Sequence, residues 1–197
     1  VTVQNNTSVQ ETEGLDTEQT EKYAGVAVDP DAGRNLSIRN NEFYGYSGHG
    51  VHVNGEIRDV AVQDNTLARP ARTGVRVRHA TNGQVTGNLV VESGTDGLQV
   101  EDSTDVVVRD NYVRRPGGAG IDVRGGSGTA GHDVASNFVA EAGGDGDAPA
   151  IRVCDRGVRV RGNTVRRHRS AAIEECSGGG ENVYEANHAD GEDPWRV

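Results

Sequence analysis

The stretch Val60-Ala-Val-Gln-Asp-Asn65-Thr-Leu67, followed by Gly74-Val-Arg-Val77, decides the fold of this chain. Apolar and polar side chains alternate in both parts, and this period of two residues is typical of short strands with one buried face. Glycine and asparagine at fixed places predict tight turns with unusual backbone angles between the strands. The stretch is one copy of a pattern that recurs along the chain.

The recurring pattern contains an asparagine after the first strand and a Gly-apolar-x-apolar strand after a loop. The asparagines follow one another after 35 residues at first and then after 23 to 26 residues. They are Asn6, Asn41, Asn65, Asn88, Asn111, Asn137, Asn163 and Asn187. The second strand starts at Gly25, Gly50, Gly74, Gly97, Gly120, Ala150 and Ala172. A unit of about 23 residues cannot bury its apolar face alone, so the units must stack into a solenoid.

Three short strands per unit with parallel stacking predict an all-β fold. It is a right-handed parallel β-helix of about seven to eight coils with an asparagine ladder. The repeat resembles that of pectate-lyase-like and NosD-type proteins, in which one asparagine per coil stacks at a turn. This resemblance covers nearly the whole chain and implies the fold, whereas a fold alone does not fix an activity.

Composition excludes several classes of protein. The chain has 20 Lys and Arg residues against 30 Asp and Glu residues, a formal net charge of −10. This balance argues against a nucleic-acid partner, which needs a basic stripe to meet phosphates. We expect no membrane span, because no apolar run approaches the roughly 20 residues of a membrane helix. The acidic, Met-free composition, with arginine far more common than lysine, suits a high-GC organism and raises the hypothesis of a halophile.

The repeat divides the chain into residues 1–189, predicted to form the β-helix, and a tail of residues 190–197. Residues 10–23 form a polar insertion in the first coil, and residues 141–149 form a second loop. The tail breaks the pattern and contains Trp195, so we expect it to fold over the last coil as a cap.

Metal and partner expectations come from the second loop and from the first strand. Asp145 and Asp147 are a candidate Ca²⁺ site in the second loop. Two carboxylates, however, fall short of the roughly six to eight oxygens that calcium takes. No other cofactor is expected. Since Val1 begins directly with a repeat strand, we expect a preceding domain or a partner chain to cap it.

The two cysteines fall at equivalent positions of adjacent coils. Aligning Ile151 with Ile173 places Cys154 opposite Cys176. Equivalent positions lie about 4.8 Å apart, inside the range of Cα separations in disulfides. The pattern predicts a disulfide and an oxidising compartment, with two stacked thiols as the alternative.

Outward side chains of the second strand form two polar columns. The first is Ala27, His52, Arg76, Gln99, Asp122, Arg152 and Glu174, and the second is Asp29, Asn54, Arg78, Glu101, Arg124, Cys154 and Cys176. The candidate groove is the strip about four coils long, made of His52, Asn54, Arg76, Arg78, Gln99, Glu101, Asp122 and Arg124. His52 and Asp122 are three coils apart and therefore form no dyad.

The strip has the residue types for chemistry on an acidic glycan. Glu101 or Asp122 is predicted as the acid/base, because paired carboxyls perform glycoside chemistry. Arg76, Arg78 and Arg124 are predicted to bind uronate carboxylates, which guanidinium groups match bidentately. The alternative is an ionic ladder of alternating sign that only stabilises the stack.

Two short resemblances point to His49. The segment Ser47-Gly-His-Gly-Val-His-Val53 looks like the Gly-His-Gly coil of polygalacturonases, which implies a catalytic His49 with Arg76 and Arg78 as substrate binders. That family also has paired aspartates in the preceding strand, and Ala24-Gly-Val-Ala-Val28 has none. The segment Tyr44-Gly-Tyr-Ser-Gly-His49 is similar to a motif of alginate epimerases. Aligned residue by residue, Tyr44 and His49 match that motif and its aspartate falls on Ser47. Aligned by the strand pattern, the aspartate falls on His52.

Two classes of function remain open from the sequence. One is an extracellular or cell-surface β-helix that recognises or modifies an acidic polysaccharide as a lyase, epimerase or hydrolase. The other is a structural solenoid without chemistry, such as a tail-spike, adhesin, stalk or filament segment. A periplasmic accessory protein of the NosD type is a third reading, and the absence of Met and of His/Cys clusters counts against copper handling.

Overall fold

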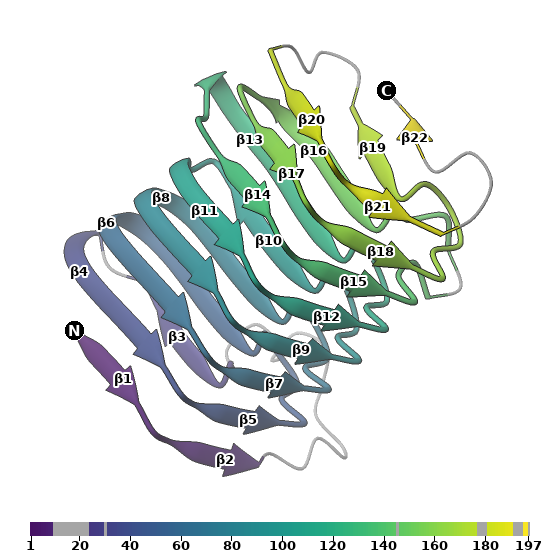
Figure 1. The fold of residues 1–197 in the computed structure, drawn as a ribbon. Coiled ribbons are helices and arrows are strands. Elements are labelled where there is room, and N and C mark those ends of the chain that lie inside the picture. Colours follow the sequence, from purple (N-terminus) through teal and green to yellow (C-terminus); the bar gives the residue numbers. More distant parts are fainter. Residues whose placement is uncertain (10–23, 30, 145, 177–180, 191–194, 197) are drawn as a thin grey trace.

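The computed structural model describes residues 1–9, 24–29, 31–144, 146–176, 181–190 and 195–196. These residues form 22 strands and no helix, wound into a solenoid with parallel strands (Figure 1). Each turn has three sides, named here faces 1, 2 and 3 in chain order. Within the described part, no helix is long and apolar enough to cross a membrane.

Two hydrogen-bonded sheets make the three faces. Face 2 is the eight-stranded sheet β2 (Thr7–Val9), β5 (Glu42–Tyr44), β7 (Thr66–Ala68), β9 (Leu89–Val91), β12 (Tyr112–Arg114), β15 (Phe138–Ala140), β18 (Thr164–Arg166) and β21 (His188–Ala189). Faces 1 and 3 form one 14-stranded sheet, because the long strands β6 (Val51–Gln63) and β8 (Val75–Thr86) bend around the corner between them.

The other strands divide between faces 1 and 3. Face 1 contains β1 (Thr2–Gln4), β4 (Ala32–Arg39), the second parts of β6 and β8, β11 (Thr104–Arg109), β14 (Asp133–Ala135), β17 (Arg159–Arg161) and β20 (Val183–Glu185). Face 3 contains β3 (Val26–Val28), the first parts of β6 and β8, β10 (Leu98–Glu101), β13 (Ile121–Thr129), β16 (Ile151–Arg156), β19 (Ile173–Glu175) and β22 (Trp195–Arg196).

The predicted all-β parallel solenoid is confirmed. Six of the eight strands on face 2 lie between two neighbours, so about six complete turns are flanked by a partial turn at each end. This number of complete turns is slightly lower than the predicted seven to eight. In the tail, β22 pairs with β19 and continues face 3. The polar insertion 10–23 lies outside the described residues.

The core is a narrow stack of aliphatic side chains. Val51, Val75, Leu98 and Ile121 are in register on successive turns, and each is at most 1% exposed. The glycine before each of these residues has a packing role, because a Cβ at Gly97 would lie 2.6 Å from the carbonyl oxygen of Gly120. The repeat glycines are therefore needed where neighbouring turns approach closely.

The predicted asparagine ladder is confirmed as a continuous chain of amides that is buried from Asn41 to Asn163. Asn88 Nδ2 donates to Asn111 Oδ1 at 3.0 Å, and the Asn88 backbone N–H donates to the same oxygen at 2.9 Å. The same side-chain bond joins every successive pair of the eight predicted asparagines. Each turn thus satisfies buried polar groups of its neighbour, which fixes the register of the stack.

The unusual backbone angles fall one residue away from the predicted place. Neither the ladder asparagines nor the repeat glycines such as Gly97 have a positive φ among the described residues. The residue before each ladder asparagine does, as at Asn40, Asp64 and Gly87. The sequence prediction of left-handed turn residues was right for the turn and wrong for the repeat glycines, because packing is what requires glycine there.

Candidate functional site

The register of face 3 confirms the two predicted polar columns. His52, Arg76, Gln99 and Asp122 are consecutive partners on neighbouring strands, and Arg152 and Glu174 follow them. Asn54, Arg78, Glu101, Arg124 and Cys154 form the parallel column two residues further along. His52 and Asp122 are three turns apart in this register, so the prediction that they form no dyad is confirmed.

One half of the strip is an ion-pair cluster. Glu101 Oε2 lies 2.8 Å from Arg76 Nη2 and 3.2 Å from Arg78 Nε, with the side chain of Glu101 20% exposed. Arg78 also lies 3.7 Å from Asp102. Asn54 lies near the edge of this cluster and donates to Asp29 Oδ1 at 3.0 Å. Glu101 therefore holds two arginines in place and corresponds to the predicted ionic ladder.

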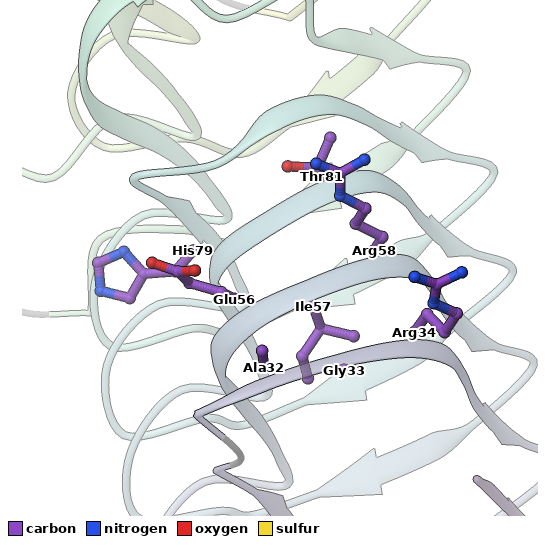
Figure 2. Close-up of a pocket in the computed structure, with 8 residues that line it drawn as sticks. All are labelled: Ala32, Gly33, Arg34, Glu56, Ile57, Arg58, His79 and Thr81. Carbon is purple, nitrogen blue, oxygen red and sulfur yellow. The ribbon is translucent and has the colours of Figure 1, made fainter.

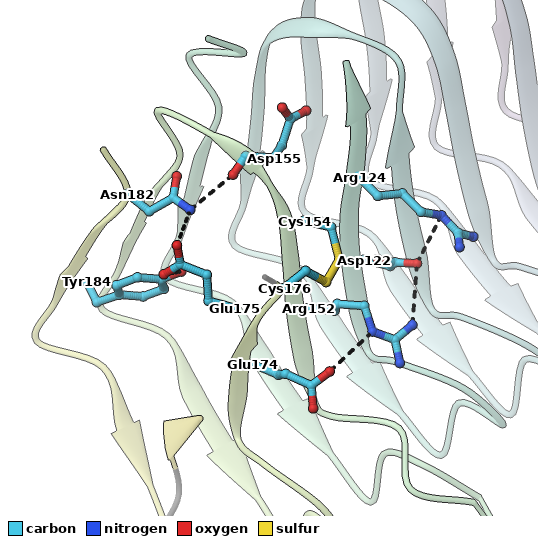
Figure 3. Close-up of a disulfide and its surroundings, with 10 residues drawn as sticks. All are labelled: Asp122, Arg124, Arg152, Cys154, Asp155, Glu174, Glu175, Cys176, Asn182 and Tyr184. Carbon is cyan, nitrogen blue, oxygen red and sulfur yellow. Dashed lines mark hydrogen bonds and ion pairs between the residues drawn. A yellow bond between two sulfur atoms is a disulfide. The ribbon is translucent and has the colours of Figure 1, made fainter. Parts of the chain in front are cut away.

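The other half of the strip departs from a simple ladder. Arg124 Nε lies 3.3 Å from Asp122 Oδ2, and Arg124 Nη2 lies 3.9 Å from Asp96 Oδ2. Asp122 is fully buried, and Arg152 Nη1 approaches it at 3.9 Å from the next turn (Figure 3). Burial and, to a smaller extent, the nearby Asp96 carboxylate raise the pKa of Asp122 to about 6. Its arginine neighbours Arg124 and Arg152 oppose this shift.

A groove of about 720 Å³ lies at the start of the face 3 strands, beside this second half. Its lining is Ser47, His49, Ala71, Arg72, Thr73, Arg76, Thr95, Asp96, Gln99 and Arg124. Of the predicted site residues, it brings together His49, Arg76, Gln99 and Arg124. The other predicted residues, His52, Asn54, Arg78, Glu101 and Asp122, are not part of its lining.

Asp96 and Arg72 are groove residues that sequence reasoning missed. Asp96 Oδ1 accepts a hydrogen bond from the Ala119 backbone N–H at 2.8 Å, and its Oδ2 accepts from Gln99 Nε2 at 3.3 Å. A signal was available in the repeat. The residue immediately before each repeat glycine forms its own column, in which His49, Thr73 and Asp96 are joined turn by turn by backbone hydrogen bonds to those glycines.

His49 is a neutral histidine in the lining of the groove. It is 3% exposed, and its ring lies 4.7 Å from the ring of His52, measured between centroids. Burial and, to a smaller extent, the charges of His52, Arg76 and Arg72 lower the pKa of His49 to about 3. His49 therefore enters the groove uncharged at neutral pH, as a hydrogen-bonding group.

The predicted disulfide between Cys154 and Cys176 is confirmed, with a Cα–Cα distance of 4.7 Å (Figure 3). It joins the last two regular turns next to the column of Asp122 and Arg152. Within the described residues, no group of three or more His, Cys, Asp or Glu side chains is placed to hold a metal ion. Asp145, half of the calcium hypothesis, lies outside those residues.

A family model described as the right-handed β-helix region matches residues 1–146. The chain belongs to this right-handed β-helix family. The match covers more than half of the sequence, and it agrees with the parallel turns and asparagine ladder described above. No curated protein matches this β-helix in sequence.

Several solved structures are similar to this β-helix. The receptor-binding domain of the Siphovirus 9NA tailspike is 12% identical, with a TM-score of 0.48, over 87% of this chain and 44% of that one. The A-module of the Azotobacter vinelandii mannuronan C-5 epimerase AlgE4 is 16% identical, with a TM-score of 0.45, over 83% and 64%. An alginate lyase from Paenibacillus is 12% identical, with a TM-score of 0.31, over 87% and 80%. The β-helix thus spans less than two thirds of the first two chains.

A second buried pair of ionisable groups lies in the β-helix away from the groove. His132 Nδ1 accepts a hydrogen bond from the Val106 backbone N–H at 3.1 Å, and His132 Nε2 lies 3.7 Å from Asp155 Oδ2. Both side chains are 1% exposed, and burial lowers the pKa of His132. His132 Nδ1 thus satisfies a buried backbone N–H group at the corner between faces 3 and 1.

Proposed function

We propose that this β-helix binds an acidic polysaccharide along face 3 and moves a proton at a uronate residue in the groove. The observation that carries this proposal is the buried Asp122 beneath Arg124 and beside Asp96, at a groove that Arg72 and Arg76 also line.

The positive charge of the groove favours an anionic ligand. Three arginines line one groove in a chain whose formal net charge is −10, so this groove is a local exception to the acidic molecule. Guanidinium groups bind carboxylates through two parallel hydrogen bonds. A polysaccharide with a carboxylate on each sugar fits Arg76 and Arg124, while the Glu101 contact holds Arg76 in its position.

Neutralising a uronate carboxylate makes the neighbouring C5 proton more acidic, which favours lyase or epimerase chemistry over hydrolysis. In our proposal Asp96 accepts the C5 proton. A group whose pKa is about 6 holds its proton part of the time near neutral pH, so Asp122 serves as the acid. Asp122 then protonates O4 as the C4–O4 bond breaks, or returns a proton to C5 from the opposite side.

Asp122 must be uncovered for this role, and Arg124 is the group that covers it. The side chain of Arg124 is 42% exposed, whereas that of Asp122 is fully buried. A substrate carboxylate that draws Arg124 outward would remove the nearest positive charge from Asp122. That change raises the pKa of Asp122 further and favours the protonated acid at the moment when the substrate is bound.

The same assignment supports an extracellular or cell-surface location, where polysaccharides are found. The Cys154–Cys176 disulfide is consistent with it, because disulfides persist mainly in oxidising compartments. The cap predicted before Val1 and the division into residues 1–189 and 190–197 stay predictions.

The structural solenoid is the second candidate, and a specific observation favours it. Five side chains of alternating charge follow one corner of the stack, with ion-pair distances of 2.7 to 3.7 Å between successive turns. They are Arg69, Glu92, Arg115, Glu141 and Arg167. Such a ladder fixes the register of turns and needs no ligand.

A turnover screen separates the two candidates. The purified chain is incubated with polygalacturonate, alginate and glycosaminoglycans, with and without calcium, while reducing ends, unsaturated products and epimer content are followed. We expect turnover that disappears in Asp122→Asn and Arg76→Ala and persists in Arg159→Gln, an exposed arginine on face 1. Binding that is lost in the same two variants, without turnover in the wild type, would leave a recognition module. Neither binding nor turnover would favour the structural solenoid.

A further inference from the structure

Two arginines stand side by side where face 1 begins, on the opposite end of the β6 and β8 region from the groove. Arg34 on β4 is the register partner of Arg58 on β6, and Thr81 on β8 follows in the same column. Both arginines are exposed. Like charges directly opposite one another on neighbouring strands destabilise a sheet, so this pair needs a compensating interaction.

Many arginines of the solenoid pair with carboxylates. Arg76, Arg109 and Arg115, for example, each lie within 3.1 Å of a carboxylate oxygen on a neighbouring turn. Among the residues that the structure describes, neither Arg34 nor Arg58 lies within ion-pair distance of a carboxylate. Their charges therefore remain available to a ligand.

A hollow of about 490 Å³ lies against these two arginines. Figure 2 shows Arg34, Arg58 and Thr81 on one side, whereas Glu56 and His79 project to the other side of the view. The single carboxylate of the lining thus points away from the two guanidinium groups. Thr81 Oγ1 accepts a hydrogen bond from Thr104 Oγ1 at 3.4 Å, which leaves the proton of Thr81 free for a ligand.

We propose that Arg34, Arg58 and Thr81 bind a tetrahedral oxyanion, either a sulfate ester on a glycan or the free inorganic anion. Two guanidinium groups from turns about 4.8 Å apart approach from different directions, and a hydroxyl adds a third donor. Three separate donors suit a group with three or four oxygens better than a planar carboxylate. The anion offsets the repulsion between the two arginines, and the site lies outside the groove that contains Asp122.

The test is a titration with sodium sulfate at constant ionic strength, kept constant with sodium chloride. Binding is followed through the Nε–Hε NMR signals of the arginines, which Arg34→Gln and Arg58→Gln assign. We expect saturable shifts confined to these two signals, and at least about a tenfold loss of affinity in either variant. The matched control is Arg39→Gln, because Arg39 lies exposed on the same strand with Gln63 as its register partner.

Further arms identify the source of the anion and guard against misfolding. A sulfated oligosaccharide that binds more tightly than sulfate indicates a glycan ester, and equal binding indicates the free anion. A uronate oligosaccharide that binds as tightly as the sulfated one overturns the proposal.

Arg34→Gln should raise the thermal midpoint of the protein at low ionic strength without sulfate, because it removes the repulsion between Arg34 and Arg58. A lowered midpoint contradicts that repulsion. Shifts that do not saturate, or an equal loss in Arg39→Gln, overturn the site. Asp122→Asn should leave sulfate binding unchanged, so failure here is distinct from failure of the groove.

Discussion

Replacing Asn111 with alanine should cost much more stability than the same change at the end of the ladder. Asn111 is 2% exposed, and its side chain makes four hydrogen bonds to neighbouring turns. Its Oδ1 accepts from the backbone and side-chain N–H groups of Asn88, and its Nδ2 donates to the Val85 carbonyl and to Asn137 Oδ1. The alanine variant leaves these partners buried with fewer hydrogen bonds.

The magnitude follows from those four bonds. A typical intramolecular hydrogen bond contributes about 1 kcal/mol net, and buried groups that lose a partner cost more. Asn111→Ala should therefore lower the free energy of unfolding by about 4 kcal/mol. Asn6 is the matched control, because it is exposed at the first turn and its side chain only donates, to Asn41 Oδ1 and to the Gln4 carbonyl. Asn6→Ala should cost about 1 kcal/mol or less.

Equilibrium unfolding in urea, followed by circular dichroism, measures both differences under one set of conditions. The m-value should be equal in the two variants and the wild type, since a changed m-value would signal uncoupled turns. Equal and small losses in the two variants would refute the reasoning, because they would mean that the buried ladder contributes no more than a surface amide.

Three further predictions concern charge and redox state. Asp122→Asn should remove a pH dependence of stability. The pKa of Asp122 is about 6 in the folded protein against 3.8 for an ordinary aspartate, so the folded state binds the proton more tightly and wild-type stability falls as pH rises from about 4 to about 6. Chemical unfolding of both proteins should show that the free energy of unfolding of the variant, relative to that of the wild type, rises by about 3 kcal/mol between pH 3 and pH 7. Parallel pH profiles of the two proteins would contradict this prediction. Reducing the Cys154–Cys176 disulfide, which spans 22 residues, should lower stability by about 3 kcal/mol in unfolding with and without reductant; no change would mean that the bridge is absent in solution. Arg115→Gln should lower the thermal midpoint at low salt and much less at high salt, because Arg115 pairs with Glu141 near the surface, and a salt-independent loss would point to packing instead.

The repeat made the fold and the register of face 3 predictable. Because Gly97-Leu-Gln-Val and Gly120-Ile-Asp-Val align without gaps, the partners of Gln99 and Cys154 could be assigned before any coordinates. The alternation of apolar residues leaves one register that buries the apolar side of each strand, since a slip of one residue would turn that side outward.

The groove was less predictable, because most of its residues come from the segments between faces 2 and 3. Asp96 and Arg72 lie just before the repeat strands Gly97-Leu-Gln-Val and Gly74-Val-Arg-Val, at positions where the pattern fixes only the glycine that follows, so the alternation of apolar residues does not single them out. The direction of the Arg124 side chain, toward Asp122 and away from a simple ladder, depends on burial and on Asp96. The partner of a long side chain depends on its three-dimensional surroundings, which the aligned repeat sequence does not show.

The proton transfer that we propose in the groove has a direct test in deuterated water. A uronate oligosaccharide that binds the wild type is incubated with it in D₂O, and deuterium at C5 is measured in the recovered sugars together with any unsaturated product. The account predicts deuterium at C5 or an unsaturated end with the wild type, and neither with Asp122→Asn. An unchanged, unlabelled oligosaccharide after prolonged incubation with the wild type would contradict it.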